Sequence, residues 1–180
     1  MVLMKSSNEL KKGDLAPEFS LLATNGKEYS LQDFAGKKAY LIVFICNHCP
    51  YVVPKIKELK RIADDFPDVA VICINSNESE NYPEDSYEKM QEYMQEWAAE
   101  FVYLHDETQE VAKAYGAVCT PDPFLFDKDK KLIFHSRIDD AHGEEGGNPE
   151  LYPAIEEYLE KGEITLEEKP SMGCSIKWRS

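Results

Sequence analysis

The sequence has no run approaching about 18 consecutive apolar residues, which a helix needs to cross a membrane. Its first residues lack the long apolar stretch after a basic start that marks a secretory signal, so we expect a cytoplasmic protein. Basic residues are also few, with 20 Lys and Arg against 34 Asp and Glu, for a formal net charge of −14. This charge disfavours nucleic acid and anionic membrane surfaces as partners.

Internal repeats and low-complexity segments are absent as well, and the 180 residues are 43% hydrophobic and 30% charged. We therefore expect one domain, residues 1–180, with residues 163–180 as a C-terminal tail. A chain of this size does not need disulfides for its stability, and its cysteine count is odd. The five cysteines are Cys46, Cys49, Cys73, Cys119 and Cys174.

Two of these cysteines lie three positions apart in the stretch Cys-Asn-His-Cys-Pro, residues 46–50. The stretch follows a continuous apolar run, residues 39–45, and precedes apolar residues at helical spacing, residues 56–66. The start of a helix has unpaired N–H groups and a positive dipole end, which favour a thiolate over a thiol. A dithiol between a buried strand and a helix predicts redox chemistry.

The remaining patterns predict alternating strands and helices in a mixed sheet with helices on both faces. Asn25-Gly26 predicts a first hairpin, and a charged turn at residues 127–131 predicts a second. The other expected elements are strands at 69–75 and 101–104 and helices at 83–99, 107–115 and 148–162.

Several stretches together resemble the thioredoxin fold in its peroxiredoxin-like branch, the redoxin or alkyl hydroperoxide reductase/thiol-specific antioxidant group. Residues 13–37 look like the N-terminal β-hairpin extension of redoxins, and Thr120-Pro121 stands where this fold places a cis-proline. Residues 136–140 and the ending 173–178 are similar to those of a subgroup with the Cys-Asn-His-Cys-Pro motif. The resemblance implies an α/β, thioredoxin-like fold with a central mixed sheet flanked by helices.

By this resemblance Cys46 is the nucleophile and Cys49 resolves the mixed disulfide. A residue before proline is pushed away from helical angles, which would instead make Cys49 the N-cap of the following helix. His48, when protonated, would lower the pKa of a neighbouring thiol, or it simply faces solvent. The alternatives are two buried structural thiols, or metal ligation by Cys46, His48 and Cys49, which lacks a second ligand pair.

Four further residues are candidates near this site. The resemblance implies that Pro121 packs beside the dithiol and offers backbone groups to a substrate, although Pro123 could be the cis-proline instead. Cys119 is either a third redox partner or a small buried apolar residue, and Cys174 either resolves an oxidised Cys46 or Cys49 or does nothing. Arg137 either polarises a peroxide or is an ordinary surface charge.

The sequence therefore predicts a thiol–disulfide oxidoreductase without cofactor or resident metal. Its substrates would be a disulfide-containing protein, a small thiol or a peroxide, with an electron donor of the thioredoxin or glutathione type. Thiol peroxidase with an antioxidant role is the alternative, although Phe44 and Ile45 stand where the peroxidase signature has Pro and Thr or Ser. The third hypothesis is a copper or zinc carrier that uses Cys46, Cys49 and a distal His135.

Overall fold

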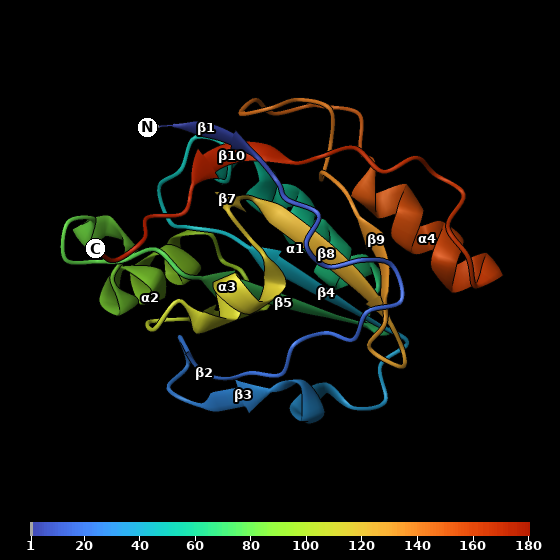
Figure 1. Cartoon of the computed structure of the whole chain (residues 1–180), viewed down its shortest axis with the longest axis horizontal. Coiled ribbons are helices and arrows are strands. Elements are labelled where there is room, and N and C mark those ends of the chain that lie inside the picture. Colours follow the sequence, from blue (N-terminus) through green and yellow to red (C-terminus); the bar gives the residue numbers. More distant parts are fainter. Residues whose placement is uncertain (1) are drawn as a thin grey trace.

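The computed structural model describes residues 2–180, and a mixed sheet of seven strands runs through the middle of the molecule (Figure 1). β4 (Ala39–Phe44) lies inside this sheet, parallel to β5 (Val69–Asn75) and antiparallel to β8 (Asp122–Asp127). The strand order is β3-β2-β6-β5-β4-β8-β9, with β2 (Ser20–Ala23), β3 (Glu28–Ser30), β6 (Val102–His105) and β9 (Leu132–His135). The predicted central mixed sheet and both hairpins are confirmed.

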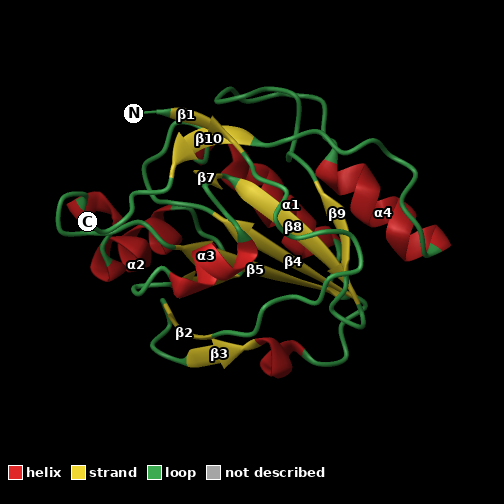
Figure 2. Cartoon of the chain, viewed as in Figure 1, coloured by secondary structure: helices red, strands yellow, loops and turns green. Residues whose placement is uncertain are grey.

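Side chains of β4 point alternately into two apolar layers, because successive residues of a strand face opposite sides of the sheet. Leu41 and Val43 pack in the layer of α1 (Ile56–Asp65), α2 (Tyr87–Glu96) and α4 (Leu151–Lys161). Tyr40, Ile42 and Phe44 pack in the opposite layer with α3 (Glu110–Tyr115) and the N-terminal extension. Figure 2 shows these helices around the yellow strands, as the α/β prediction requires.

A second, small sheet joins the two ends of the described chain. β10 (Met172–Ser175) lies between β1 (Leu3–Lys5) and β7 (Cys119–Thr120), antiparallel to both. Figure 1 shows these segments side by side at one end of the molecule, blue next to red. The expected C-terminal tail therefore contains a strand that packs beside the cis-proline region.

The last helix begins later than predicted. α4 starts at Leu151, three residues after the expected start at residue 148. The Asn148 side chain and backbone N–H instead donate to the Asp140 carboxylate, which draws this residue into the preceding loop. Gly116 and Gly162 end α3 and α4 in the left-handed conformation, and both helices end where the ranges 107–115 and 148–162 predict. Within residues 2–180, no helix combines the length and apolar character that a bilayer span requires.

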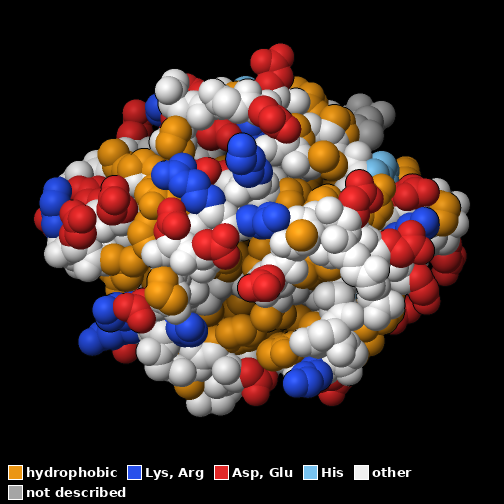
Figure 3. Space-filling view, turned by 180° about the vertical axis from the view of Figure 1, so that it is seen from behind, with side chains coloured by type: hydrophobic (Ala, Val, Ile, Leu, Met, Phe, Trp, Pro, Cys, Tyr) orange, Lys and Arg blue, Asp and Glu red, His pale blue; other side chains and the backbone are white. Residues whose placement is uncertain are grey.

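On the face opposite to that of Figure 1, acidic and basic side chains are interspersed with apolar side chains (Figure 3).

Candidate active site

Cys46 and Cys49 lie just beyond the carboxyl end of β4, beside β7. Cys46 Sγ is 3.4 Å from Thr120 Oγ1, and Cys49 Sγ is 3.8 Å from the Thr120 carbonyl oxygen. The Thr120–Pro121 peptide bond is cis, as predicted, and Pro123 belongs to β8. The fold therefore brings both thiols of the motif to the residue that precedes the cis-proline.

Cys174 joins the two motif cysteines from β10. Its Sγ lies 2.6 Å from Cys49 Sγ, and all three residues are buried, with 2–3% of their surface exposed. Register places Cys174 opposite Thr120 of β7, and so next to the same residue that both motif thiols contact. All five cysteines are thiols in this structure.

Hydrogen bonds among the three thiols set their acidity. The pKa of Cys49 is lowered by its hydrogen bonds with Cys174 and with Cys46, and the Tyr51 backbone adds a further hydrogen bond. The pKa of Cys46 is raised well above its usual value by its hydrogen bond to Cys49, by burial and by the nearby Asp85 carboxylate. The pKa of Cys174 is raised by its hydrogen bond to Cys49 and by burial. Of the three thiols, Cys49 is therefore the one whose pKa is lowered.

The predicted helix start at Cys49 is wrong. α1 begins only at Ile56, after a 3-10 helix at Val53–Lys55. The Cys49 carbonyl accepts from the N–H groups of Val52 and Val53 in a tight turn. Pro54 has no N–H to donate to Pro50, so a regular α-helical ladder cannot begin at the motif. Thiol hydrogen bonds, rather than a helix dipole, account for the acidity of Cys49.

A buried polar network fixes the other side of the motif. The Asp85 carboxylate accepts from the Asn47 backbone N–H at 2.9 Å and from Asn77 Nδ2 at 2.8 Å. The Tyr103 hydroxyl donates to Asn47 Oδ1 at 2.8 Å. His48 Nδ1 lies 3.6 Å from Asp85 Oδ2, with about a third of its side chain exposed (35%). Asp85 is the last residue of a 3-10 helix at Pro83–Asp85, and no pattern in the sequence distinguishes it from the neighbouring acidic residues.

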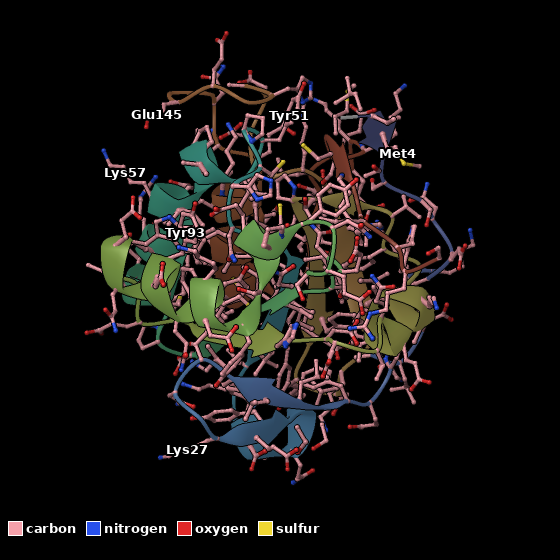
Figure 4. All side chains as sticks on the ribbon, turned by 90° about the vertical axis from the view of Figure 1, so that its left-hand side faces the viewer. Met4, Lys27, Tyr51, Lys57, Tyr93 and Glu145 are labelled. Carbon is pink, nitrogen blue, oxygen red and sulfur yellow. The ribbon has the colours of Figure 1, made fainter. Side chains whose placement is uncertain are left out.

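Residues 139–147 cover the motif from outside. The Lys55 ammonium is buried and bonds Asp139 Oδ1 at 2.7 Å, the Glu144 carbonyl at 2.6 Å and the Ala141 carbonyl. Any Cβ on Gly143 would touch the Tyr51 ring at 3.2 Å, so this loop packs closely on the residue two positions after Cys49. In Figure 4, Tyr51 lies at the same end of the molecule as Met4 of β1 and Glu145 of the loop.

The opening beside Pro121 is small. A cavity of about 20 Å³ lies there, lined by Tyr51, Lys55 and Pro121 among others, which is room for about one water molecule. In this conformation the thiols are therefore closed off from a protein substrate.

The other predicted residues do not touch the motif thiols through any described contact. The Arg137 guanidinium donates to both carboxylate oxygens of Glu150 at 2.8 Å. This ion pair joins the segment that follows β9 to the residue before α4. Cys119 and Cys73 are fully buried, and burial raises the pKa of each thiol. His135 Nε2 is 2.7 Å from Asp122 Oδ1.

His135 is thereby occupied in the core, where its ring also stacks on Phe124 with centroids 4.0 Å apart. Within the described part of the chain, no three His, Cys, Asp or Glu side chains are grouped so as to hold a metal ion. The structure thus offers no ligand set for the carrier hypothesis among residues 2–180.

Comparison with known proteins adds the following. The Redoxin family model matches residues 11–147. Thiol-disulfide oxidoreductase ResA of Bacillus thuringiensis subsp. konkukian is 26% identical over 155 residues, which is 85% of this chain and 79% of the relative. The putative peroxiredoxin bcp of Helicobacter pylori is 25% identical over 111 residues, 61% of this chain and 68% of the relative.

Solved structures are similar over the whole chain. An uncharacterised conserved protein from Geobacillus kaustophilus superposes with a TM-score of 0.91 at 42% identity, covering 99% of this chain and 97% of that protein. The small β1-β10-β7 sheet lies inside the matched region, because the match extends over nearly all residues.

Proposed function

This chain belongs to the Redoxin family, and from that membership we propose that it is a thiol–disulfide oxidoreductase in which Cys49 is the attacking group. Its relatives include thiol-disulfide oxidoreductases and a putative peroxiredoxin, so the chemistry is that of a thiol-dependent oxidoreductase. The observation that supports Cys49 is its position between Cys46 and Cys174, whose hydrogen bonds with it lower its pKa. A thiolate is the nucleophilic form of cysteine.

In the proposed reaction, the Cys49 thiolate attacks one sulfur of a substrate disulfide. A mixed disulfide forms, and the first substrate thiolate leaves with the electron pair and takes up a proton. Cys46 then loses its proton and attacks Cys49 Sγ, which forms the Cys46–Cys49 disulfide and releases the second substrate thiol. This order reverses the one that the resemblance to thioredoxin implies.

The neighbouring residues take positioning roles in this proposal. His48 Nδ1 lies 3.6 Å from Asp85 Oδ2 and its side chain is partly exposed, and a cationic imidazole would favour a thiolate beside it. The backbone before Pro121 would offer groups to an extended substrate segment once β10, which pairs with β7 at Thr120, has moved aside. Both roles require residues 139–147 to move away from Tyr51, because each motif thiol is only 2% exposed.

Partners follow from the same chemistry. We expect a disulfide-containing protein or small disulfide as substrate, and a thioredoxin- or glutathione-type dithiol or thiol as electron donor, in a cytoplasmic setting. Peroxide reduction has less support, since Arg137 is bound to Glu150 and so does not offer its guanidinium to a peroxide at Cys49.

The test is dithiothreitol-driven reduction of insulin. The parent chain should accelerate the reaction, and Cys49→Ser should return the rate to that of dithiothreitol alone. Cys73→Ala is the matched control, because this thiol is equally buried but lies within β5, and it should keep the parent rate. A Cys49→Ser chain as active as the parent would overturn the proposal.

A further inference from the structure

Cys174 lies against Cys49 although 125 residues separate them along the chain. Their sulfur atoms are 2.6 Å apart, and both residues are buried. A disulfide requires two cysteines whose sulfurs can approach to about 2.05 Å without backbone movement. At 2.6 Å, the sulfurs of Cys49 and Cys174 are already close to this bonding distance.

The backbone around Cys174 is built for this close approach. β10 pairs with β7 on one side, Cys174 opposite Thr120, and with β1 on the other side, Cys174 opposite Leu3. A Cβ on Gly173 would collide with the carbonyl oxygen of Thr120, so only glycine lets β10 lie this close to β7. Cys174 is therefore held in place from both sides.

We propose that Cys174 is a second resolving cysteine, so that the oxidised chain carries a Cys49–Cys174 disulfide in exchange with the Cys46–Cys49 disulfide. This inference rests on the proposed function, which supplies the oxidised Cys49. It adds a second redox pair that joins the motif to the C-terminal strand.

The exchange balances without an outside oxidant. Cys174 loses a proton to solvent, and its thiolate attacks Cys49 Sγ of the Cys46–Cys49 disulfide. The Cys49–Cys174 bond forms, the Cys46–Cys49 bond breaks, and Cys46 leaves with the electron pair and takes up a proton. The same attack on a Cys49 mixed disulfide releases the substrate thiol instead. One disulfide is present before and after each exchange.

Thr120 lies beside all three sulfurs, since both motif thiols contact it and Cys174 is its register partner. The lowered pKa of Cys49, for which the Cys174 hydrogen bond is the largest cause, agrees with a working contact between these two thiols. The exchange would return Cys46 to the thiol form, and the chain would still contain one disulfide, now between Cys49 and Cys174.

Peptide mapping of the oxidised chain tests this. The reduced parent protein is treated with excess oxidised glutathione, its remaining thiols are blocked with N-ethylmaleimide, and it is digested with trypsin without reduction. Cys46 and Cys49 fall in peptide 39–55, and Cys174 falls alone in peptide 162–177. Cys73 and Cys119 fall in peptides 62–89 and 114–128, so every pair of linked peptides has a distinct mass. Fragmentation of peptide 39–55 then shows whether Cys46 or Cys49 has the maleimide.

The expected result is a cross-link between peptides 39–55 and 162–177 with the maleimide on Cys46. Cys46→Ser should keep this cross-link, and the control Cys119→Ala, changed on the strand next to β10, should keep it too. An internal disulfide in peptide 39–55 as the only product, with the maleimide on Cys174, would overturn the inference. So would a link between Cys46 and Cys174.

Failure here is separable from failure of the proposed function. If Cys49→Ser loses insulin reduction but the oxidised parent chain shows no cross-link, only the role of Cys174 is rejected. A cross-link in a chain whose Cys49→Ser variant still reduces insulin would uphold the disulfide and reject the proposed reaction.

Discussion

Cys49 has two sulfur neighbours, Cys46 and Cys174, and its hydrogen bonds with both lower the pKa of its thiol. A hydrogen bond to a charged group stabilises that group by about 1.5–3 kcal/mol, so each of the two contacts favours the thiolate form of Cys49. The thiolate should persist well below the ordinary cysteine pKa of about 8.5.

Replacing Cys174 by Ala and by Ser distinguishes the effect of its hydrogen bond on Cys49 from the effect of its thiol group. Cys174→Ala removes this hydrogen bond, so the pKa of Cys49 should rise, and the pH below which alkylation of Cys49 slows should rise with it. Cys174→Ser keeps an O–H donor and should stay close to the parent. Thiolate absorbance at 240 nm against pH measures this, and equal pKa values in the Ala variant and the parent would contradict it.

Residues that are local in sequence could be predicted, and residues that meet only in the fold could not. Cys46, His48 and Cys49 stand together in one short motif, and Thr120-Pro121 has a known place in the resembling fold. The Cys49–Cys174 contact spans 125 residues, and no spacing rule covers such a distance. The role of Asp85 likewise depends on three groups from different elements: Asn47, Asn77 and His48.

At the scale of elements, β10 depends on a glycine. Gly173→Ala would push β10 away from the Thr120 carbonyl of β7 and move Cys174 from Cys49. The oxidised variant should therefore lose the cross-link between peptides 39–55 and 162–177 while still forming the Cys46–Cys49 disulfide. The control is Ser175→Ala in the same strand, which should keep the cross-link. If oxidised Gly173→Ala still showed the cross-link between peptides 39–55 and 162–177, Gly173 would not be what holds Cys174 against Cys49.

The loop over the motif depends on one ammonium group. Lys55→Met removes the donor to Asp139, Ala141 and Glu144 and leaves the Asp139 carboxylate without its cation. Breaking a buried ion pair costs about 3 kcal/mol of unfolding free energy. We expect that loss in urea unfolding, together with faster alkylation of the motif thiols.

Lys57→Met is the matched control for this change, since Lys57 lies two residues further along, in the first turn of α1, and its side chain is exposed. It should alter neither stability nor alkylation rate by a measurable amount. If Lys55→Met left the alkylation rate at the parent value, the loop would not be what limits access to the thiols.

Element types could be predicted more reliably than element starts. The strands near 39–45 and 69–75 and the helix stops at Gly116 and Gly162 are where the patterns placed them. α1 starts late because Pro54 breaks the ladder, and a proline four residues after Pro50 is visible in the sequence. The late start of α4 has no such signal, since it follows from the contact between Asn148 and Asp140.

At the scale of the whole molecule, the proposed disulfide would join the middle of the chain to its last strand. In the loop-entropy relation, a cross-link over 125 residues stabilises the folded chain by about 5 kcal/mol, and one over three residues by about 2 kcal/mol. Oxidation of Cys46→Ser should thus raise the unfolding free energy more than oxidation of Cys174→Ser. Guanidinium unfolding of each variant, oxidised and reduced, measures this, and equal gains would argue against the long cross-link.

Fold class was predictable because the strand and helix patterns alternate along the chain, which favours a mixed sheet flanked by helices. The small β1-β10-β7 sheet was not predictable, because β1 and β7 have three and two residues. Strands this short carry no periodic signal. That sheet nevertheless brings the third thiol to the motif.

The most direct measurement is the trapping of the first covalent intermediate. In a Cys46→Ser, Cys174→Ser chain, the Cys49 thiolate keeps two hydroxyl donors but has no thiol beside it that can release the substrate. Mixed with a small peptide disulfide, this chain should accumulate one peptide adduct per molecule, located on Cys49 in tryptic peptide 39–55 by mass spectrometry. The absence of an adduct, or an adduct on Cys73 or Cys119 instead, would contradict the account.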